Sequence, residues 1–128
     1  MTYFGYVSPS SFGGFCLPVP FQNQLLRARA ADLKMSFGLG VGEVVLSGCF
    51  LGLFETLRVA SAGDVIGCCS LEMLPRDYRL DLLQQEMFDR TVQLDCLFEF
   101  TGVRADVRAA VRDLEWTKTI GREISYEN

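Results

Sequence analysis

The chain has 128 residues, of which 49% are apolar, and a formal net charge of −4. This length is typical of a single domain, and the apolar fraction excludes an intrinsically disordered chain. The negative charge, with no run rich in Lys and Arg, argues against nucleic acid as a partner.

The N-terminus and the cysteines indicate the compartment. No basic segment followed by an apolar stretch opens the chain, and its apolar runs are shorter than the roughly 20 residues of a membrane span. Its five Cys form no C-x-x-C pair, which favours reduced thiols. We therefore expect a cytoplasmic protein with no signal peptide and no membrane partner.

The chain contains no His. This excludes a Ser-His-Asp or Cys-His triad supplied by one chain. Without His and without a paired Cys motif, a zinc site of the usual type is not expected. We predict no metal and no cofactor.

The first half of the chain alternates strand and helix patterns. Aromatic and β-branched residues from Tyr3 to Val7 predict a strand. Apolar residues recur at helical spacing from Phe21 to Leu33, which predicts an amphipathic helix. Met35 to Leu39 is expected as a second strand. Phe50 to Leu57 is expected as a helix with an apolar face wide enough to be buried on two sides.

The second half continues the alternation. The almost continuous apolar run from Val65 to Leu71 is typical of a central parallel strand covered on both faces. Leu80 to Phe88 predicts a third helix, Val92 to Phe100 a further strand, and Ala105 to Glu115 a last helix.

This order predicts an α/β fold: a single-domain parallel sheet of about four strands flanked by helices, over residues 1–120. Residues 121–128 are predicted to form a C-terminal tail outside this domain, in an ordered or a disordered form. Ligands of such sheets bind beyond the carboxyl ends of the strands, where the strand order reverses. That rule selects Ser8 to Ser11, Ser47 to Cys49, Ser70 to Arg76, and Glu99.

The candidate substrate-binding residues are polar or charged side chains at expected strand ends and helix starts. Serines there either bind a phosphate or simply form turns. Amides at a helix start either bind sugar hydroxyls or only make the helix end polar, and the arginines either bind an anion or form ion pairs. The set consists of Ser8, Ser10, Gln22, Asn23, Arg27, Ser47, Ser70, Arg76 and Glu99.

Proton transfer without His falls to carboxylates, Tyr, Lys or Cys, so the candidate acid/base carboxylates are Glu43, Glu55, Glu72 and Glu99. The catalytic residues predicted from these types are Glu55, Glu72, Cys49 and Tyr6. Glu55 has apolar neighbours that suggest burial, with a purely structural bond to Arg27 or to a backbone group as the alternative. Glu72 is expected at the mouth of the central strand. Cys49 is either a nucleophile at a helix start or a small core residue. Tyr6 is either an acid or a core aromatic.

Short motifs in order along the chain resemble the sporadic carbohydrate cluster protein family: Gly5-Tyr6, Phe12-Gly13, Val19-Pro20-Phe21-Gln22-Asn23 with Arg27, Glu43, Ser47-Gly48-Cys49, Glu55, Ser70-Leu71, Leu74-Pro75 and Phe98-Glu99. The resemblance extends to about Lys118. Members occur in bacterial gene clusters for surface polysaccharides and other sugar-containing natural products. It implies a role in carbohydrate biosynthesis and no particular reaction.

A more distant likeness is to the catalytic domain of serine recombinases, carried by Phe4-Gly5-Tyr6 before Ser8 or Ser10, Ser47-Gly48, Gly63-Asp64-Val65-Ile66, Ser70-Leu71-Glu72 and Arg76. It implies resolvase-like or flavodoxin-like layering. Val7 and Pro9 flank the first serine, and Met73 stands where that family has an arginine, so DNA cleavage is not expected.

Together these observations predict an enzyme or enzyme subunit acting on a sugar, sugar phosphate or nucleotide sugar. Metal-free acid/base chemistry such as isomerisation, epimerisation or elimination fits the residue types. The alternative is a non-catalytic carbohydrate-binding or scaffolding subunit. We also expect a homo-oligomer, with part of Phe50 to Phe54 in the interface.

Overall fold

The computed structural model of the chain describes residues 1–9, 17–40, 50–100 and 102–127, with side chains through residue 120. Within these residues four parallel strands form one sheet: β1 (Thr2–Gly5), β2 (Ser36–Leu39), β3 (Val65–Cys68) and β4 (Gln93–Cys96). Their order is β2-β1-β3-β4. This is the order of the first four strands of a flavodoxin-like sheet.

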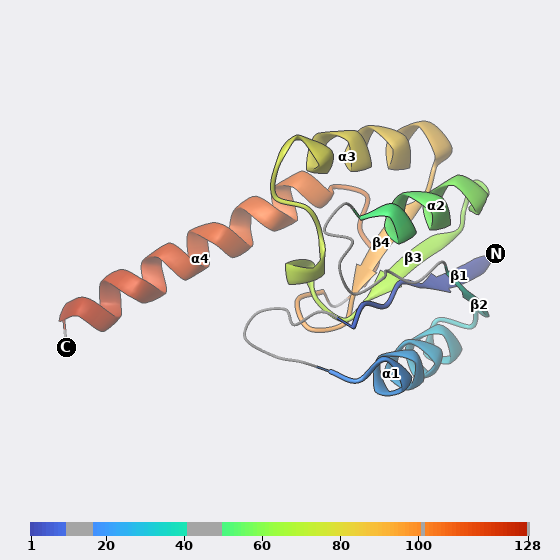
Figure 1. Cartoon of the computed structure of the whole chain (residues 1–128), viewed down its shortest axis with the longest axis horizontal. Helices are drawn as coiled ribbons and strands as arrows, with labels where there is room; N and C mark the ends of the chain where they lie inside the picture. Colours follow the sequence, from blue (N-terminus) through green and yellow to red (C-terminus); the bar gives the residue numbers. More distant parts are fainter. Residues whose placement is uncertain (10–16, 41–49, 101, 128) are drawn as a thin grey trace.

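Helices cover both faces of the sheet (Figure 1). Helix α1 (Val19–Asp32) lies on one face, and α2 (Leu51–Val59) and α3 (Tyr78–Arg90) lie on the other. A short 3₁₀ helix, η1 (Leu71–Met73), follows β3. The predicted single-domain α/β class is therefore confirmed, and the four residues of β3 are all buried between β1 and β4, as predicted for a central strand.

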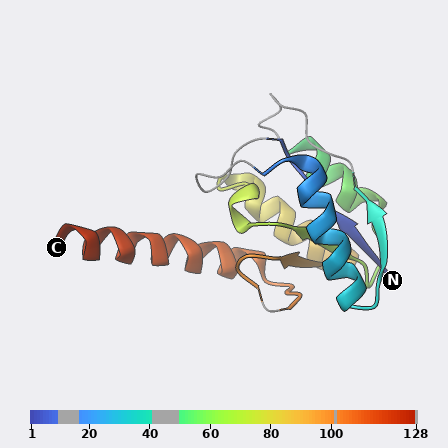
Figure 2. The same cartoon turned by 90° about the horizontal axis from the view of Figure 1, so that it is seen from below.

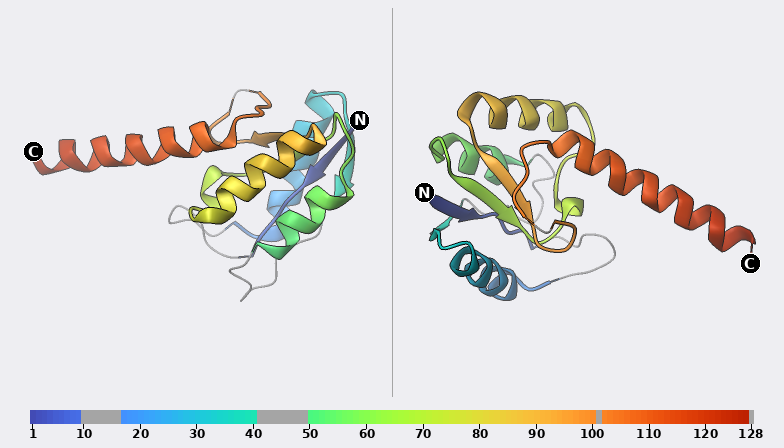
Figure 3. Two further views of the ribbon diagram at one scale, coloured as in Figure 1. Left: turned by 90° about the horizontal axis from the view of Figure 1, so that it is seen from above. Right: turned by 180° about the vertical axis from the view of Figure 1, so that it is seen from behind.

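Helix α4 (Val107–Glu127) begins beside α3 and extends away from the sheet in every view (Figures 1, 2 and 3). Its first turns are anchored because Val107, Ala110 and Val111 are buried. The helix predicted to end at Glu115 thus continues to Glu127, through a segment with little apolar periodicity.

Three strands end earlier than the sequence predicts. β1 ends at Gly5 rather than Val7, β3 at Cys68 rather than Leu71, and β4 at Cys96 rather than Phe100. The chain turns after Cys96, where the Phe100 amide donates to the Cys96 carbonyl oxygen at 2.9 Å. It then runs back beside β4, so that Leu94 and Arg104 form an antiparallel bridge.

The two faces of the sheet hold different cores. Under α2 and α3 lies a large apolar cluster that includes Leu53, Leu57 and Leu83. The prediction that α2 has an apolar face wide enough to be buried on two sides holds only in part. α2 packs on the core beneath it and against α3, but Leu51 and Val59 are exposed on its outer side.

Under α1 the cluster is small, and a buried polar network stands beside it. The Tyr3 hydroxyl donates to Asp95 Oδ2 at 2.7 Å, and Arg29 donates to the same carboxylate from α1 at 3.0 and 3.2 Å. Gly67 makes this possible, because a Cβ there would lie 2.0 Å from the Tyr3 hydroxyl oxygen. Tyr3 therefore crosses β3 at a glycine to reach β4.

Candidate functional site

The chain segments that leave β1 and β3 meet at the carboxyl edge of the sheet. β1 and β3 are neighbours, and from them the chain proceeds to opposite faces, to α1 and to α3. The strand order reverses at this point, which is where open α/β sheets bind ligands. We call the polar residues that follow β1, β3 and β4 here the carboxyl-edge site: Tyr6, Ser8, Ser70, Glu72 and Glu99.

Ser70 and Glu99 form the centre of the carboxyl-edge site. The Ser70 hydroxyl donates to Glu99 Oε1 at 2.6 Å, and the Leu71 amide donates to Oε2 at 3.0 Å. Ser70 also accepts from the Glu72 amide at 3.1 Å, which caps η1. Ser70 is buried while Glu99 is exposed. A carboxylate fixed on a hydroxyl in this way can take up a proton and can accept hydrogen bonds from a ligand.

Gln22 is fully buried and closes the connection between β1 and α1. Its Nε2 donates to the carbonyl oxygens of Ser8 at 2.8 Å and Leu17 at 2.7 Å, and its Oε1 accepts from the Ser8 amide at 3.3 Å. The expectation that the Gln22 amide binds a ligand is not met, because its oxygen and its nitrogen are both hydrogen-bonded to the protein backbone. Gln22 positions the backbone of the site.

Asn23 differs from Gln22 in its hydrogen bonding. Its Oδ1 is buried and has no hydrogen-bond partner among the described residues. One turn further along α1, the guanidinium of Arg27 lies 4.6 Å from the centre of the Phe37 ring. Arg27 is thus held by a cation–π contact over β2.

Glu72 takes part in an ion cluster that joins η1 to α4. It pairs with Arg76 at 3.2 Å and with Lys118, and Arg76 also pairs with Glu115 at 3.2 Å. The Glu72 side chain is 18% exposed. As the sequence predicts, it lies just beyond the central strand, but its charge is offset by two cations. Arg76 is likewise engaged by two carboxylates.

The prediction that Glu55 is buried or paired with Arg27 is wrong. Its side chain is 35% exposed and pairs with Arg58 at 2.6 Å on the same helix. Arg27 lies on α1, across the sheet. Glu55 instead lines a cavity of about 330 Å³ between α2 and α3, together with Leu82 and Arg90.

The aromatic and thiol candidates are core residues or lie outside the described part of the chain. Tyr6 is buried in the main core. The thiols of Cys68 and Cys96 are 3.3 Å apart on β3 and β4, and burial raises the pKa of Cys96. Burial also raises the pKa of Cys69 to about 12. The thiols of Cys69 and Cys96 therefore stay protonated near neutral pH. Cys49, Ser10, Ser47 and Glu43 lie outside the described residues.

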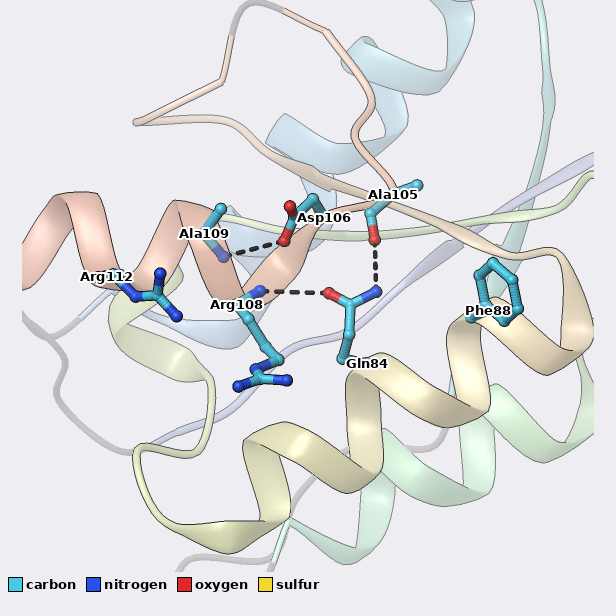
Figure 4. A pocket seen from close by; sticks show the side chains of 7 residues that line it. All are labelled: Gln84, Phe88, Ala105, Asp106, Arg108, Ala109 and Arg112. Atoms are coloured by element: carbon cyan, nitrogen blue, oxygen red, sulfur yellow. Dashed lines mark hydrogen bonds between the residues drawn. The ribbon is translucent and has the colours of Figure 1, made fainter.

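A second hollow, of about 480 Å³, lies between α3 and the start of α4 (Figure 4). Gln84 bridges the two helices: it donates to the Ala105 carbonyl oxygen at 2.9 Å and accepts from the Val107 and Arg108 amides. Asp106 accepts from the Ala109 amide. These polar groups are used to hold the first turn of α4, so we assign the hollow a structural role.

Comparisons with known proteins add no function: no protein-family model matches the chain, and no match is found among curated proteins. The likeness to the sporadic carbohydrate cluster family therefore stays a prediction. No helix in the described part of the chain is long and apolar enough to cross a membrane. Over the same residues, no three His, Cys, Asp or Glu side chains converge as metal ligands.

Proposed function

We propose that the chain is a cytoplasmic enzyme, or enzyme subunit, that acts on a sugar, sugar phosphate or nucleotide sugar by proton transfer. The observation that supports this most is the Ser70–Glu99 pair at the carboxyl-edge site. Isomerisation, epimerisation and elimination are reaction types that such proton-transferring groups can catalyse. The family resemblance supplies the substrate class.

Among the candidate carboxylates, Glu99 is the best general base. Glu72 and Glu55 are both engaged in ion pairs, whereas no ion pair involving Glu99 is found within the described residues. Both Glu99 oxygens accept hydrogen bonds, which fixes their direction. In this proposal Ser70 orients the carboxylate and Glu99 moves the proton.

The proposal is tested by a thermal-shift screen against sugars, sugar phosphates and nucleotide sugars, because a ligand at a hundred times its Kd adds about 2.7 kcal/mol of stability. A sugar that raises Tm is then assayed for turnover. Glu99→Gln should lower kcat at least a hundredfold, while Glu55→Gln, the matched control on α2, should not. Equal activity of both variants and wild type would exclude Glu99 as the base.

A second candidate is the non-catalytic, oligomeric scaffold, and α4 favours it. Trp116 is 65% exposed and Ile120 is 38% exposed. Trp116 is nine residues, or about two and a half turns, beyond the buried Val107, so it lies on the opposite side of the helix. Two exposed apolar side chains one turn apart on a projecting helix suit contact with a second copy.

Light scattering tests this candidate. Trp116→Ser should reduce the molar mass in solution from that of an oligomer to that of one chain, and Tyr78→Ser, an equally exposed aromatic on α3, should leave it unchanged. A wild-type chain that is monomeric at high concentration would rule out the homo-oligomer.

A further inference from the structure

The distal part of helix α4 extends beyond the core of its own chain. Leu114 still packs against the main core, and one turn further on the helix is joined to η1 only by ion pairs of Glu115 and Lys118. It then continues to Glu127 and away from the sheet (Figures 1 and 3). Helices shorter than about 12–15 residues are only marginally stable in water without packing partners. The distal part of α4 therefore calls for a partner surface.

The charges on and just before α4 change sign along its length. From Arg104 to Arg112 the sequence has three arginines and one aspartate, and from Asp113 to Glu127 it has four carboxylates and two cations. The first turn of α4 has no acidic residue, and its last turn has no basic residue. The helix dipole favours the reverse arrangement, so this pattern does not stabilise α4 on its own. Two such helices in antiparallel orientation would place positive charge opposite negative charge at both ends.

One side of α4 is exposed and suited to receive a second helix. Arg112, Trp116 and Ile120 follow one another at intervals of four, so they lie on one side of the helix, and all three are exposed. Arg112 also lines the 480 Å³ hollow, across from Phe88 on α3, which is 76% exposed (Figure 4). No ion pair of Arg112 is found within the described residues. The hollow and the exposed apolar residues thus share one side of α4.

We propose that two copies of the chain form a symmetric dimer in which the α4 helices pack antiparallel, the distal half of each lying against the hollow between α3 and α4 of the other copy. The contact is reciprocal, because one side of α4 supplies both surfaces. Full overlap of the two helices brings Arg112 of each copy close to Glu123 of the other. The inference rests on the oligomeric candidate above, for which it names the receiving surface and the helix orientation.

Charge reversal tests the contact and the orientation together. Arg112→Glu and Glu123→Arg should each raise the Kd of the dimer, measured by analytical ultracentrifugation, by about tenfold or more, because each places like charges opposite one another. The double variant should restore dimerisation. Within one chain, residues 112 and 123 are about 16 Å apart along the helix, so they cannot compensate each other there. Lys34→Glu, at an exposed position after α1, makes the same change of charge and is the matched control that should leave Kd unchanged.

Phe88→Ser tests whether the partner helix lies in the hollow. It removes one wall, so it should also weaken the dimer, by about fivefold or more. An unchanged Kd would overturn the placement of the partner in the hollow. Circular dichroism checks that each variant is folded.

The outcomes separate this inference from the proposal on which it rests. A wild-type chain that is monomeric at high concentration would overturn both. An oligomer that Trp116→Ser dissociates, but that neither charge reversal weakens, would overturn the antiparallel pair alone. A double variant that dimerises no better than the single variants would also overturn it.

Discussion

The two faces of the sheet are stabilised in different ways. Under α2 and α3, apolar side chains such as Leu53 and Leu83 fill a large core. Under α1, the core is small and a charged carboxylate, Asp95, is fully buried between Tyr3 and Arg29. Apolar packing depends on volume and has little direction, whereas the polar network requires each donor at one place.

This difference shows how α1 is positioned. Arg29 on α1 bonds to Asp95 on β4, and Tyr3 on β1 bonds to the same carboxylate from the other side of β3. A buried ion pair adds little stability compared with an apolar core, but removing one partner is costly. The network therefore specifies where α1 sits, and the apolar face supplies most of the favourable burial.

The largest effect on the stability of the fold is expected from Asp95→Leu. The change leaves a guanidinium and a hydroxyl without their acceptor, and it should lower the free energy of unfolding by about 3–5 kcal/mol. Urea unfolding followed by circular dichroism measures it. Asp89→Ala, on the exposed side of α3, is the control and should change stability by less than about 0.5 kcal/mol. A loss below about 1 kcal/mol for Asp95→Leu would show that the network does not position α1.

Leu83→Ala, on the other face, should lower the free energy of unfolding slightly less, by about 3 kcal/mol, because apolar burial is lost and a cavity is left. Conservative substitutions on each face test whether the two faces tolerate small changes of side-chain shape differently. Leu83→Met should cost less than about 1.5 kcal/mol, since it conserves volume. Asp95→Glu should cost more than Leu83→Met, because one extra methylene displaces both acceptor oxygens. The reverse order would contradict the distinction between the faces.

Tyr3→Phe removes one hydrogen bond to a charged group and should cost about 1.5 kcal/mol. Burial and the Asp95 carboxylate raise the pKa of Tyr3 far above its usual 10. A raised pKa contributes stability that is present below pH 10 and is lost above it, because the unfolded tyrosine then ionises while the folded one does not. Between about pH 9 and pH 11, wild type should lose stability more steeply than Tyr3→Phe. Parallel slopes would argue against this linkage.

The smallest effect is expected at Asp77, which lies at the start of α3 away from both cores. Hydrogen bonds from the Arg79 side chain and backbone lower the pKa of Asp77 from 3.8 to about 2. The stability from this contact is present above pH 3.8 and is lost as the pH falls towards 2. Asp77→Asn should keep the helix cap and show a shallower acid unfolding curve over this range. An unchanged curve would contradict the pairing with Arg79.

The fold follows from local patterns, but the polar network does not. The apolar run of β3 and the helical spacing in α1 and α3 predict these elements correctly. Tyr3 and Asp95 are 92 positions apart, and their contact depends on a strand order that one sequence does not reveal. The available signals were an Asp within the apolar segment of β4 and a Gly at position 67.

The sequence predicts where the candidate site lies, but it does not predict all of the contacts within it. The rule for parallel sheets locates Ser70, Glu72 and Glu99 at one edge, and the structure brings Ser70 and Glu99 into contact. The pairing of Glu72 with Lys118 was missed, because the last helix was expected to end at Glu115, before that lysine. Glu55 was misjudged since apolar neighbours in sequence lie on other sides of a helix.

Gln22 ties Ser8 and Leu17 to a single amide, so the segment between them starts and ends at anchored points. The conformational entropy of closing a loop between fixed ends rises by only about 0.6 kcal/mol for each doubling of its length. Segments of other lengths and sequences could therefore be inserted between these two anchors at small cost to folding. Such exchanges would leave the sheet and both cores intact.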